Sequence, residues 1–149
     1  MDTSPLIILF ADDDPDDFYL LKDGLLDVFP NHTLHYISDG TRLVDTAKEL
    51  KPDLIFLDYN MPLCDGTKCL QSLKEDPQLQ HIPVVMYSTS SMGHSVNDSY
   101  NFGAARYLIK PFNYSAISSG LRIIFDLYNN QKLITPSFEE FLVDTNRLQ

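Results

Sequence analysis

Short apolar runs alternate along this chain with longer segments in which apolar residues recur every three or four positions. Continuous apolar runs are typical of parallel strands buried on both faces, and the three- to four-residue spacing is typical of amphipathic helices. Strands are predicted at Leu6–Ala11, Thr33–Ile37, Leu54–Leu57, Val84–Tyr87 and Tyr107–Ile109. Helices are predicted at Phe18–Phe29, Thr41–Leu50, Thr67–Glu75, Ser95–Phe102 and Tyr114–Tyr128. This alternation predicts one α/β domain, in which helices wrap a parallel sheet.

The alternating pattern ends at Tyr128, where a short polar run begins. We therefore expect one domain over residues 1–128 and a C-terminal extension over residues 129–149. Within the extension, Ser137 and Glu140 have the spacing of a capping box, which predicts a short helix. Its apolar residues are Phe138, Phe141 and Leu142. The sequence leaves open whether this helix packs on its own domain or on a partner.

The composition excludes several classes of protein. With 11 basic and 21 acidic residues the net charge is −10, which disfavours binding to nucleic acid or to anionic lipid. The apolar run Leu6–Ala11 is far shorter than the ~20 residues of a membrane span, and Asp2 stands where a secretory signal would be basic. Cys64 and Cys69 are too few for a disulfide scaffold and lack the spacing of a zinc or redox motif. We expect a cytoplasmic protein.

Polar residues that carry chemistry stand where the predicted strands end. Ligands of an open parallel sheet bind outside the carboxyl ends of its strands, so these residues are expected at one edge. They are Asp12, Asp13, Asp58, Ser88 and Lys110. Neighbouring carboxylates repel unless a cation neutralises them, and oxygen ligands of this kind suit Mg²⁺. The sequence thus predicts a magnesium site, at which an aspartate can act as a nucleophile toward phosphorus.

Three further acidic residues follow the first predicted strand. Asp14, Asp16 and Asp17 directly precede or begin a predicted helix. Carboxylates at that position accept hydrogen bonds from free backbone N–H groups and favour the helix dipole. We therefore interpret these three residues as helix caps rather than as part of the magnesium site.

The strand ends also carry short motifs in a fixed order. They are LFADDDP at residues 9–15, DYNMP at 58–62 followed by Asp65-Gly66, MYSTS at 86–90 and YLIKPF at 107–112. In this order the motifs resemble the receiver domain of two-component response regulators, over about residues 5–128. The resemblance implies a CheY-like, flavodoxin-like fold: a doubly wound five-stranded parallel sheet of order 2-1-3-4-5 with five helices, here followed by the extension.

The resemblance also implies roles for individual residues. Asp58 is the expected phosphoacceptor, and Asp12 and Asp13 are the acidic pair that binds Mg²⁺ together with Asp58. The main-chain carbonyl of Asn60 completes the expected set of metal ligands. Ser88 and Lys110 are expected to bind the phosphoryl group.

The same resemblance implies roles for residues around the phosphoryl group. Tyr107 is the expected aromatic switch, which turns inward when Ser88 moves toward the phosphoryl group. Asn60, Thr89 and Ser90 are expected to tune the lifetime of that group. Thr89 departs from the family pattern, in which this residue is very small, and its side chain is expected to narrow access. Pro111 is expected to follow Lys110 through a cis peptide bond.

The function that these expectations describe is that of a stand-alone response regulator. A sensor histidine kinase or a histidine phosphotransfer protein would phosphorylate Asp58, and a downstream protein would read the surface of the fourth helix, fifth strand and fifth helix, with or without the extension. The protein would be a monomer or a phosphorylation-dependent dimer, and would catalyse only its own phosphorylation and dephosphorylation. The competing class is a magnesium-dependent phosphatase that turns over a substrate of its own.

Overall fold

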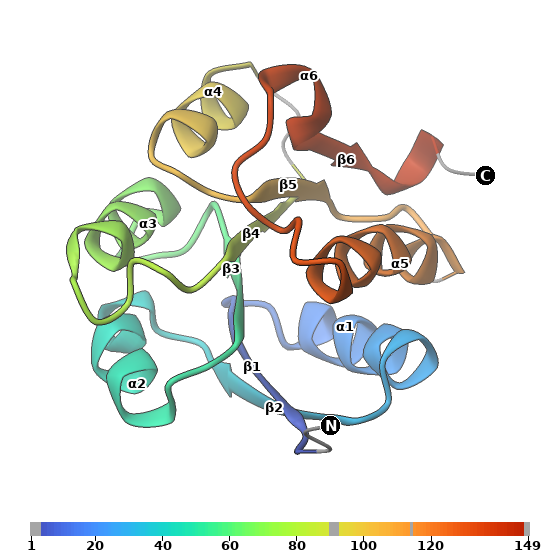
Figure 1. Cartoon of the computed structure of the whole chain (residues 1–149), viewed down its shortest axis with the longest axis horizontal. Coiled ribbons are helices and arrows are strands. Elements are labelled where there is room, and N and C mark those ends of the chain that lie inside the picture. The colour runs from blue at the N-terminus through green and yellow to red at the C-terminus, as the bar shows by residue number, and fades with distance from the viewer. Residues whose placement is uncertain (1–3, 90–92, 114, 148–149) are drawn as a thin grey trace.

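A parallel sheet forms the centre of the molecule. The computed structural model describes residues 4–89, 93–113 and 115–147. Six strands lie in the order β2-β1-β3-β4-β5-β6 (Figure 1). They are β1 (Leu6–Ala11), β2 (His32–Ile37), β3 (Leu54–Asp58), β4 (Val84–Ser88), β5 (Arg106–Ile109) and β6 (Leu142–Asp144). The predicted order 2-1-3-4-5 is confirmed for the first five strands, and their bounds agree with the predicted ones to within one residue.

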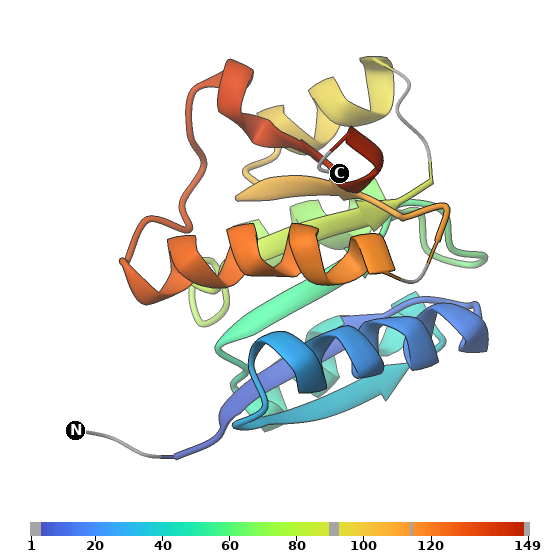
Figure 2. The ribbon, with the colours of Figure 1, turned by 90° about the vertical axis from the view of Figure 1, so that its right-hand side faces the viewer.

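Helices cover both faces of the sheet. They are α1 (Pro15–Val28), α2 (Leu43–Leu50), which follows the 3-10 turn η1 (Gly40–Arg42), α3 (Gly66–Glu75), α4 (Gly93–Asn101) and α5 (Ser115–Asn129). Helices α1 and α5 lie side by side on one face, and α2, α3 and α4 cover the other (Figures 1 and 2). The two faces of the sheet therefore support two separate apolar cores, as the continuous burial of β3 and β4 requires. Tyr114, the predicted first residue of α5, lies outside the described residues.

The extension is part of the sheet, which the prediction of five strands did not include. After α5 the chain forms α6 (Phe138–Phe141), the strand β6 and the 3-10 turn η2 (Thr145–Arg147). Strand β6 pairs in parallel with β5, with Leu108 opposite Val143, and thereby covers what would otherwise be an exposed strand edge. The strand was missed because it has three residues, too few for a readable hydrophobic pattern.

The short helix of the extension begins where its sequence predicts. Ser137 is the N-cap of α6, although its side chain makes no capping hydrogen bond. Phe141 is fully buried, whereas Phe138 and Leu142, the other two predicted contacts, are 49% and 40% exposed. The extension is thus anchored by Phe141, by the buried residues Leu133, Val143 and Thr145, and by the pairing of β6 with β5.

The two cysteines, which are too few for a disulfide scaffold, are nevertheless joined to each other. Cys64, in the loop before α3, forms a disulfide with Cys69 in that helix. Between them, Gly66 lies against the backbone of Asp58 and Tyr59, where a Cβ atom would meet main-chain atoms. The spacing of five residues carries no sequence signal for this pairing.

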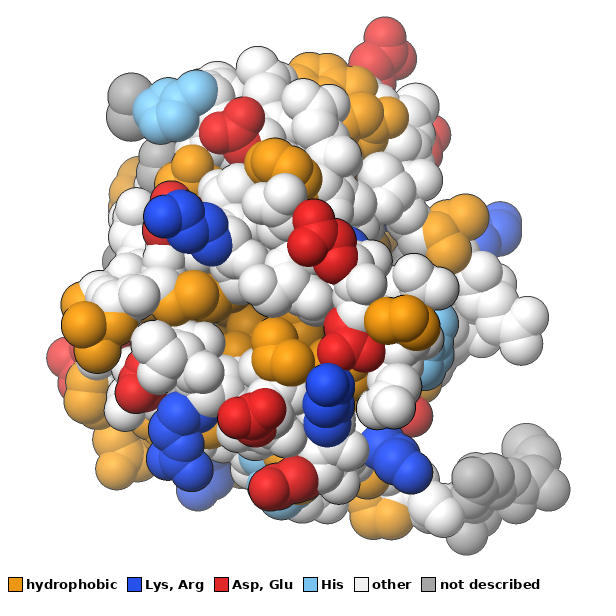
Figure 3. All heavy atoms as spheres, turned by 90° about the vertical axis from the view of Figure 1, so that its left-hand side faces the viewer, with side chains coloured by type: hydrophobic (Ala, Val, Ile, Leu, Met, Phe, Trp, Pro, Cys, Tyr) orange, Lys and Arg blue, Asp and Glu red, His pale blue; other side chains and the backbone are white. Residues whose placement is uncertain are grey.

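The acidic residues are unevenly distributed over the surface. Figure 3 shows the face over α2, α3 and α4, where acidic and basic side chains are interspersed among apolar ones. The acids at the end of β1 instead gather at the carboxyl edge of the sheet. Among the described helices, none has the length and apolar character needed to cross a bilayer.

Candidate functional site

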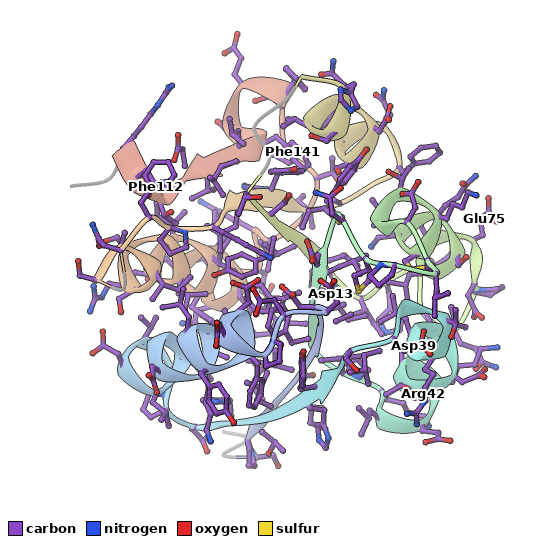
Figure 4. The ribbon with its side chains drawn as sticks, turned by 180° about the vertical axis from the view of Figure 1, so that it is seen from behind. Asp13, Asp39, Arg42, Glu75, Phe112 and Phe141 are labelled. Atoms are coloured by element: carbon purple, nitrogen blue, oxygen red, sulfur yellow. A yellow bond between two sulfur atoms is a disulfide. The ribbon has the colours of Figure 1, made fainter. Side chains whose placement is uncertain are left out.

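The parallel sheet brings the predicted site residues to a single edge. Asp12 and Asp13 follow β1, Asp58 and Ser88 end β3 and β4, and Lys110 follows β5. The strand register places Asp58 beside Tyr87 and Ser88 beside Ile109, so all these strands end at nearly the same level. Figure 4 looks onto this edge, with Asp13 near its centre. The edge is the place where an open parallel sheet binds its ligands.

Three carboxylates meet at this edge. One oxygen from each of Asp12, Asp13 and Asp58 lies within 4.8 Å of the other two. Asp12 and Asp58 are buried, and Asp13 is exposed. Oδ1 of Asp12 accepts a hydrogen bond from the backbone N–H of Asp14 at 2.8 Å, and its buried Oδ2 lies 3.0 Å from the ammonium of Lys110. Three carboxylate oxygens gathered this closely, two of them from buried residues, fit a hard divalent cation such as Mg²⁺.

Burial makes the charged forms of two of these carboxylates unfavourable. It raises the pKa of Asp12 to about 7 and that of Asp58 to about 6, although the nearby charge of Lys110 acts in the opposite direction. The backbone N–H of Asn60 donates to Oδ1 of Asp58 at 3.2 Å and also favours its ionised form. A cation at this site therefore competes with protons near neutral pH.

Lys110 is the cation that the chain itself supplies to this cluster. Its Nζ lies 2.6 Å from Asp17 Oδ2, 3.0 Å from Asp12 Oδ2 and 3.7 Å from Asp58 Oδ1. The ammonium also lies 5.4 Å from the centre of the buried Tyr87 ring. Burial acts to lower the pKa of Lys110, but the hydrogen bond with Asp17 and the charges of Asp58 and Asp12 outweigh it and raise the pKa. The lysine is thus held in its charged form inside the site.

Two neighbours of Lys110 were not predicted to belong to the site. We interpreted Asp17 as a helix cap, but its carboxylate pairs with Lys110. The capping oxygen comes instead from Asp14, which accepts from the N–H of Asp16 at 2.9 Å. The only sequence signal for Asp17 is its position in the first turn of α1, at the same edge of the sheet as Lys110. Tyr87 reads in sequence as an ordinary core residue of β4.

Ser88 and Tyr107 are both buried beneath this edge. The Tyr107 hydroxyl donates to Ser95 Oγ in α4 at 3.4 Å. Burial raises the pKa of Tyr107, and hydrogen bonds with Ser88 and Ser95 act in the opposite direction. Tyr107 is fully buried in this structure, and Phe141 of the extension packs beside its ring, with 6.4 Å between ring centres. Its movement with Ser88 stays a prediction.

The site opens to solvent through a cavity of about 500 Å³. The residues that line it are Asp13, Asp14, Pro15, Asp17, Asp58, Asn60, Thr89 and Lys110. The side chain of Thr89 is exposed at this opening, where it can limit the approach of a reactant to Asp58. Ser90, the remaining predicted tuning residue, lies outside the described residues.

The prediction of a cis peptide bond before Pro111 is wrong. The described residues, which include Lys110 and Pro111, contain no cis peptide bond. The trans form is the lower in free energy for an X-Pro bond, by about 0.5–1 kcal/mol. Here the extension holds this loop, because Asn146 accepts from the N–H of Phe112 at 2.8 Å and donates to the carbonyl of Lys110 at 3.4 Å. The expectation of a cis bond came from the family resemblance, which does not include the contacts of Asn146.

A doubly wound parallel sheet with an acidic site at its carboxyl edge places the molecule in the CheY-like class of α/β domains. Residues 8–122 match the family model of the response regulator receiver domain. The chain is 32% identical to the response regulator Rcp1 of Synechocystis over 73% of its own length and 79% of that protein. It is 28% identical to the chemotaxis protein CheY-3 of Vibrio cholerae, over 80% and 91% of the two chains.

Solved structures agree with these sequence relationships. The phosphorylated cyanobacterial phytochrome response regulator RcpA superposes with a TM-score of 0.77 at 28% identity, over 86% of this chain and 96% of RcpA. The Mn²⁺-bound form of Rcp1 superposes with a TM-score of 0.74 at 28% identity, over 89% of this chain and 100% of Rcp1. The chain therefore belongs to the response regulator receiver domain family. Membership makes it a signalling phosphoacceptor of two-component systems rather than a conventional enzyme.

Proposed function

We propose that Asp58 accepts a phosphoryl group from the phosphohistidine of a sensor kinase or a phosphotransfer protein. The observation that carries this proposal is the position of its carboxylate, which belongs to the acidic cluster, lies 3.7 Å from Lys110 Nζ and lines an open cavity. A carboxylate oxygen of Asp58 attacks phosphorus, so that an O–P bond forms and the P–N bond breaks. The electron pair of that bond leaves with the imidazole, which takes up a proton.

Mg²⁺ is the cation that we propose for the acidic cluster. The carboxylates of Asp12, Asp13 and Asp58 would hold it, together with the main-chain carbonyl of Asn60, a residue that lines the same cavity. When bound, the cation neutralises negative charge on the cluster and on the phosphoryl oxygens. The relative Rcp1 has been solved in an Mn²⁺-bound form, which supports a divalent cation as a ligand of this chain.

Phosphorylation would alter the contacts of two buried residues. A phosphoryl group adds a charge of about −1.5 to −2. Lys110 can pair with this charge, and the Ser88 hydroxyl can donate to it if it gives up its hydrogen bond with Tyr107. Because Tyr107 is already buried, we propose that the switch consists of this exchange of hydrogen bonds and not of a change in exposure. A biased equilibrium between two arrangements is sufficient for signalling.

The surface that changes lies beside the extension. Tyr107 contacts Phe141 of α6, and the Tyr100 ring of α4 packs against the same phenylalanine at 5.2 Å between ring centres. We propose that a downstream protein reads the combined surface of α4, β5, α5 and the extension. Return to the ground state would occur by hydrolysis at Asp58, at a rate that Asn60, Thr89 and Ser90 tune from the opening of the site.

Acetyl phosphate provides a direct test of this function. With Mg²⁺ present, the wild-type chain is expected to gain the mass of one phosphoryl group, and Asp58→Asn is expected to gain none. Asp16→Asn is the matched control, since it removes one exposed carboxylate near the site without touching the cluster. Equal modification of Asp58→Asn, or no modification of the wild type by any phosphoryl donor, would contradict the proposal. Repeated release of phosphate from added phosphomonoesters would support a phosphatase instead.

A further inference from the structure

The closest carboxylate to the Lys110 ammonium belongs to Asp17 and not to the proposed phosphoacceptor. Asp17 Oδ2 lies 2.6 Å from Lys110 Nζ and accepts a hydrogen bond from it. The corresponding distance to Asp58 Oδ1 is 3.7 Å. The side chains of Lys110 and Asp17 are only 10% and 18% exposed, so solvent screens this pair weakly. The main partner of the lysine therefore lies on α1, outside the acidic cluster.

Asp17 is available for this contact because other groups meet the capping needs of α1. An acidic residue at the third helical position can reach back to the backbone N–H of the N-cap residue. Here that N–H, from Asp14, already donates to Asp12 Oδ1 at 2.8 Å. Oδ1 of Asp14 in turn accepts from the N–H of Asp16. The carboxylate of Asp17 is thus left to turn toward Lys110.

We propose that Asp17 is a positioning residue that holds Lys110 when Asp58 is unmodified and competes with the phosphoryl group for its ammonium. This inference rests on the proposed function of Asp58. The lysine has three N–H donors, of which one is committed to Asp17 at the shortest distance. To approach a group bound to Asp58, Nζ must move away from Asp17 or share its donors. Asp17 consequently weakens the bond between Lys110 and the phosphoryl group, and links the start of α1 to the state of Asp58.

Beryllofluoride, which binds to a carboxylate as a stable analogue of a phosphoryl group, measures this competition at equilibrium. At saturating Mg²⁺, Asp17→Asn is expected to bind beryllofluoride about three- to tenfold more tightly than the wild type. A change in affinity of this size is expected when one partly screened charged hydrogen bond no longer competes. Asp16→Asn makes the same change of charge one residue earlier in the helix, and its affinity is expected to stay within about twofold of the wild type. Thermal unfolding of both variants verifies that each remains folded.

A double-mutant cycle tests whether Asp17 acts through the lysine. In a Lys110→Gln background, Asp17→Asn is expected to gain no more affinity than Asp16→Asn, because the ammonium for which Asp17 competes is absent. A merely structural role for Asp17 would give the same change in affinity with and without the lysine. That result, or equal affinities of Asp17→Asn and Asp16→Asn, overturns the inference while wild-type binding still supports the proposed function. If the wild type takes up neither beryllofluoride nor a phosphoryl group, the inference and the proposed function both fail.

Discussion

Replacement of Phe141 by alanine tests whether the extension is an integral part of this domain. Phe141 is fully buried, and its ring contacts those of Tyr100 in α4 and Tyr107 in β5. No other residue of α6 is buried, so this side chain anchors the helix on the sheet. Its removal leaves a void next to Tyr107 and weakens the attachment of β6 to the edge of β5.

The expected loss of stability follows from this burial. Truncation of a buried phenylalanine to alanine destabilises proteins by about 3–5 kcal/mol, and edge-to-face ring contacts contribute about 0.5–1.5 kcal/mol of such values. Because the short helix α6 can partly collapse into the void, we expect about 3 kcal/mol for Phe141→Ala. In a domain of this size that loss lowers the melting temperature by roughly 6–12 °C.

Urea denaturation followed by circular dichroism measures this loss directly. Phe138→Ala is the matched control, since it removes the same side chain from the same helix at a position that is 49% exposed. Phe138 contacts Tyr100 at 5.2 Å between ring centres, and its truncation is expected to lower the free energy of unfolding by about 1 kcal/mol or less. Equal effects of the two variants, or a loss below about 1 kcal/mol for Phe141→Ala, would refute the view that Phe141 anchors the extension.

Three further predictions concern the site. Burial raises the pKa of Asp12 from 3.8 to about 7, so the folded state binds its proton more tightly than the unfolded state and stability falls as the pH rises across that interval. Asp12→Asn is therefore expected to stabilise the metal-free protein by about 2 kcal/mol at about pH 8 in urea denaturation with a chelator, and a loss of stability would contradict this reasoning. For the same reason Mg²⁺ should raise the melting temperature of the wild type more at about pH 8 than at about pH 5.5, and an equal shift at both would argue against a carboxylate site. Thr89→Ala should be phosphorylated faster by acetyl phosphate than the wild type, whereas equal rates would show that Thr89 does not narrow access to Asp58.

Much of the fold could be predicted because a strand buried on both faces appears in the sequence as a continuous apolar run. The five apolar runs correspond to β1 to β5, and the helix spacing located α1 to α5. Strand β6 has no continuous apolar run. Only one of its three residues, Val143, is buried. Its place beside β5 depends on the packing of Phe141, which is a tertiary contact that no local pattern contains.

The part of the site that could be predicted consists of the residues at the ends of the strands. Asp12, Asp13, Asp58, Ser88 and Lys110 meet at one edge because parallel strands end together. Contacts made by side chains from a helix or from the extension were not predictable in this way. Asp17 has an ordinary interpretation as a helix cap, and only the tertiary structure shows that Asp14 fills that role and leaves Asp17 to Lys110.

The same limit applies to the loop after β5 and to the switch tyrosine. The family pattern led us to expect a cis bond before Pro111 and a Tyr107 that turns inward when Ser88 moves. Both expectations omit the extension, whose Asn146 holds the loop and whose Phe141 packs beside Tyr107. Residues 129–149 therefore modify the site as well as the sheet, and this effect could not be read from the receiver motifs alone.

The central claim is that Asp58 carries the phosphoryl group, and chemical trapping tests it most directly. Borohydride reduces an aspartyl phosphate to homoserine, while free carboxylates do not react. After incubation with acetyl phosphate and Mg²⁺, peptide mass spectrometry of the reduced protein is expected to find homoserine at position 58 and aspartate at positions 12, 13 and 17. Homoserine at one of those positions, with position 58 unchanged, would contradict the account.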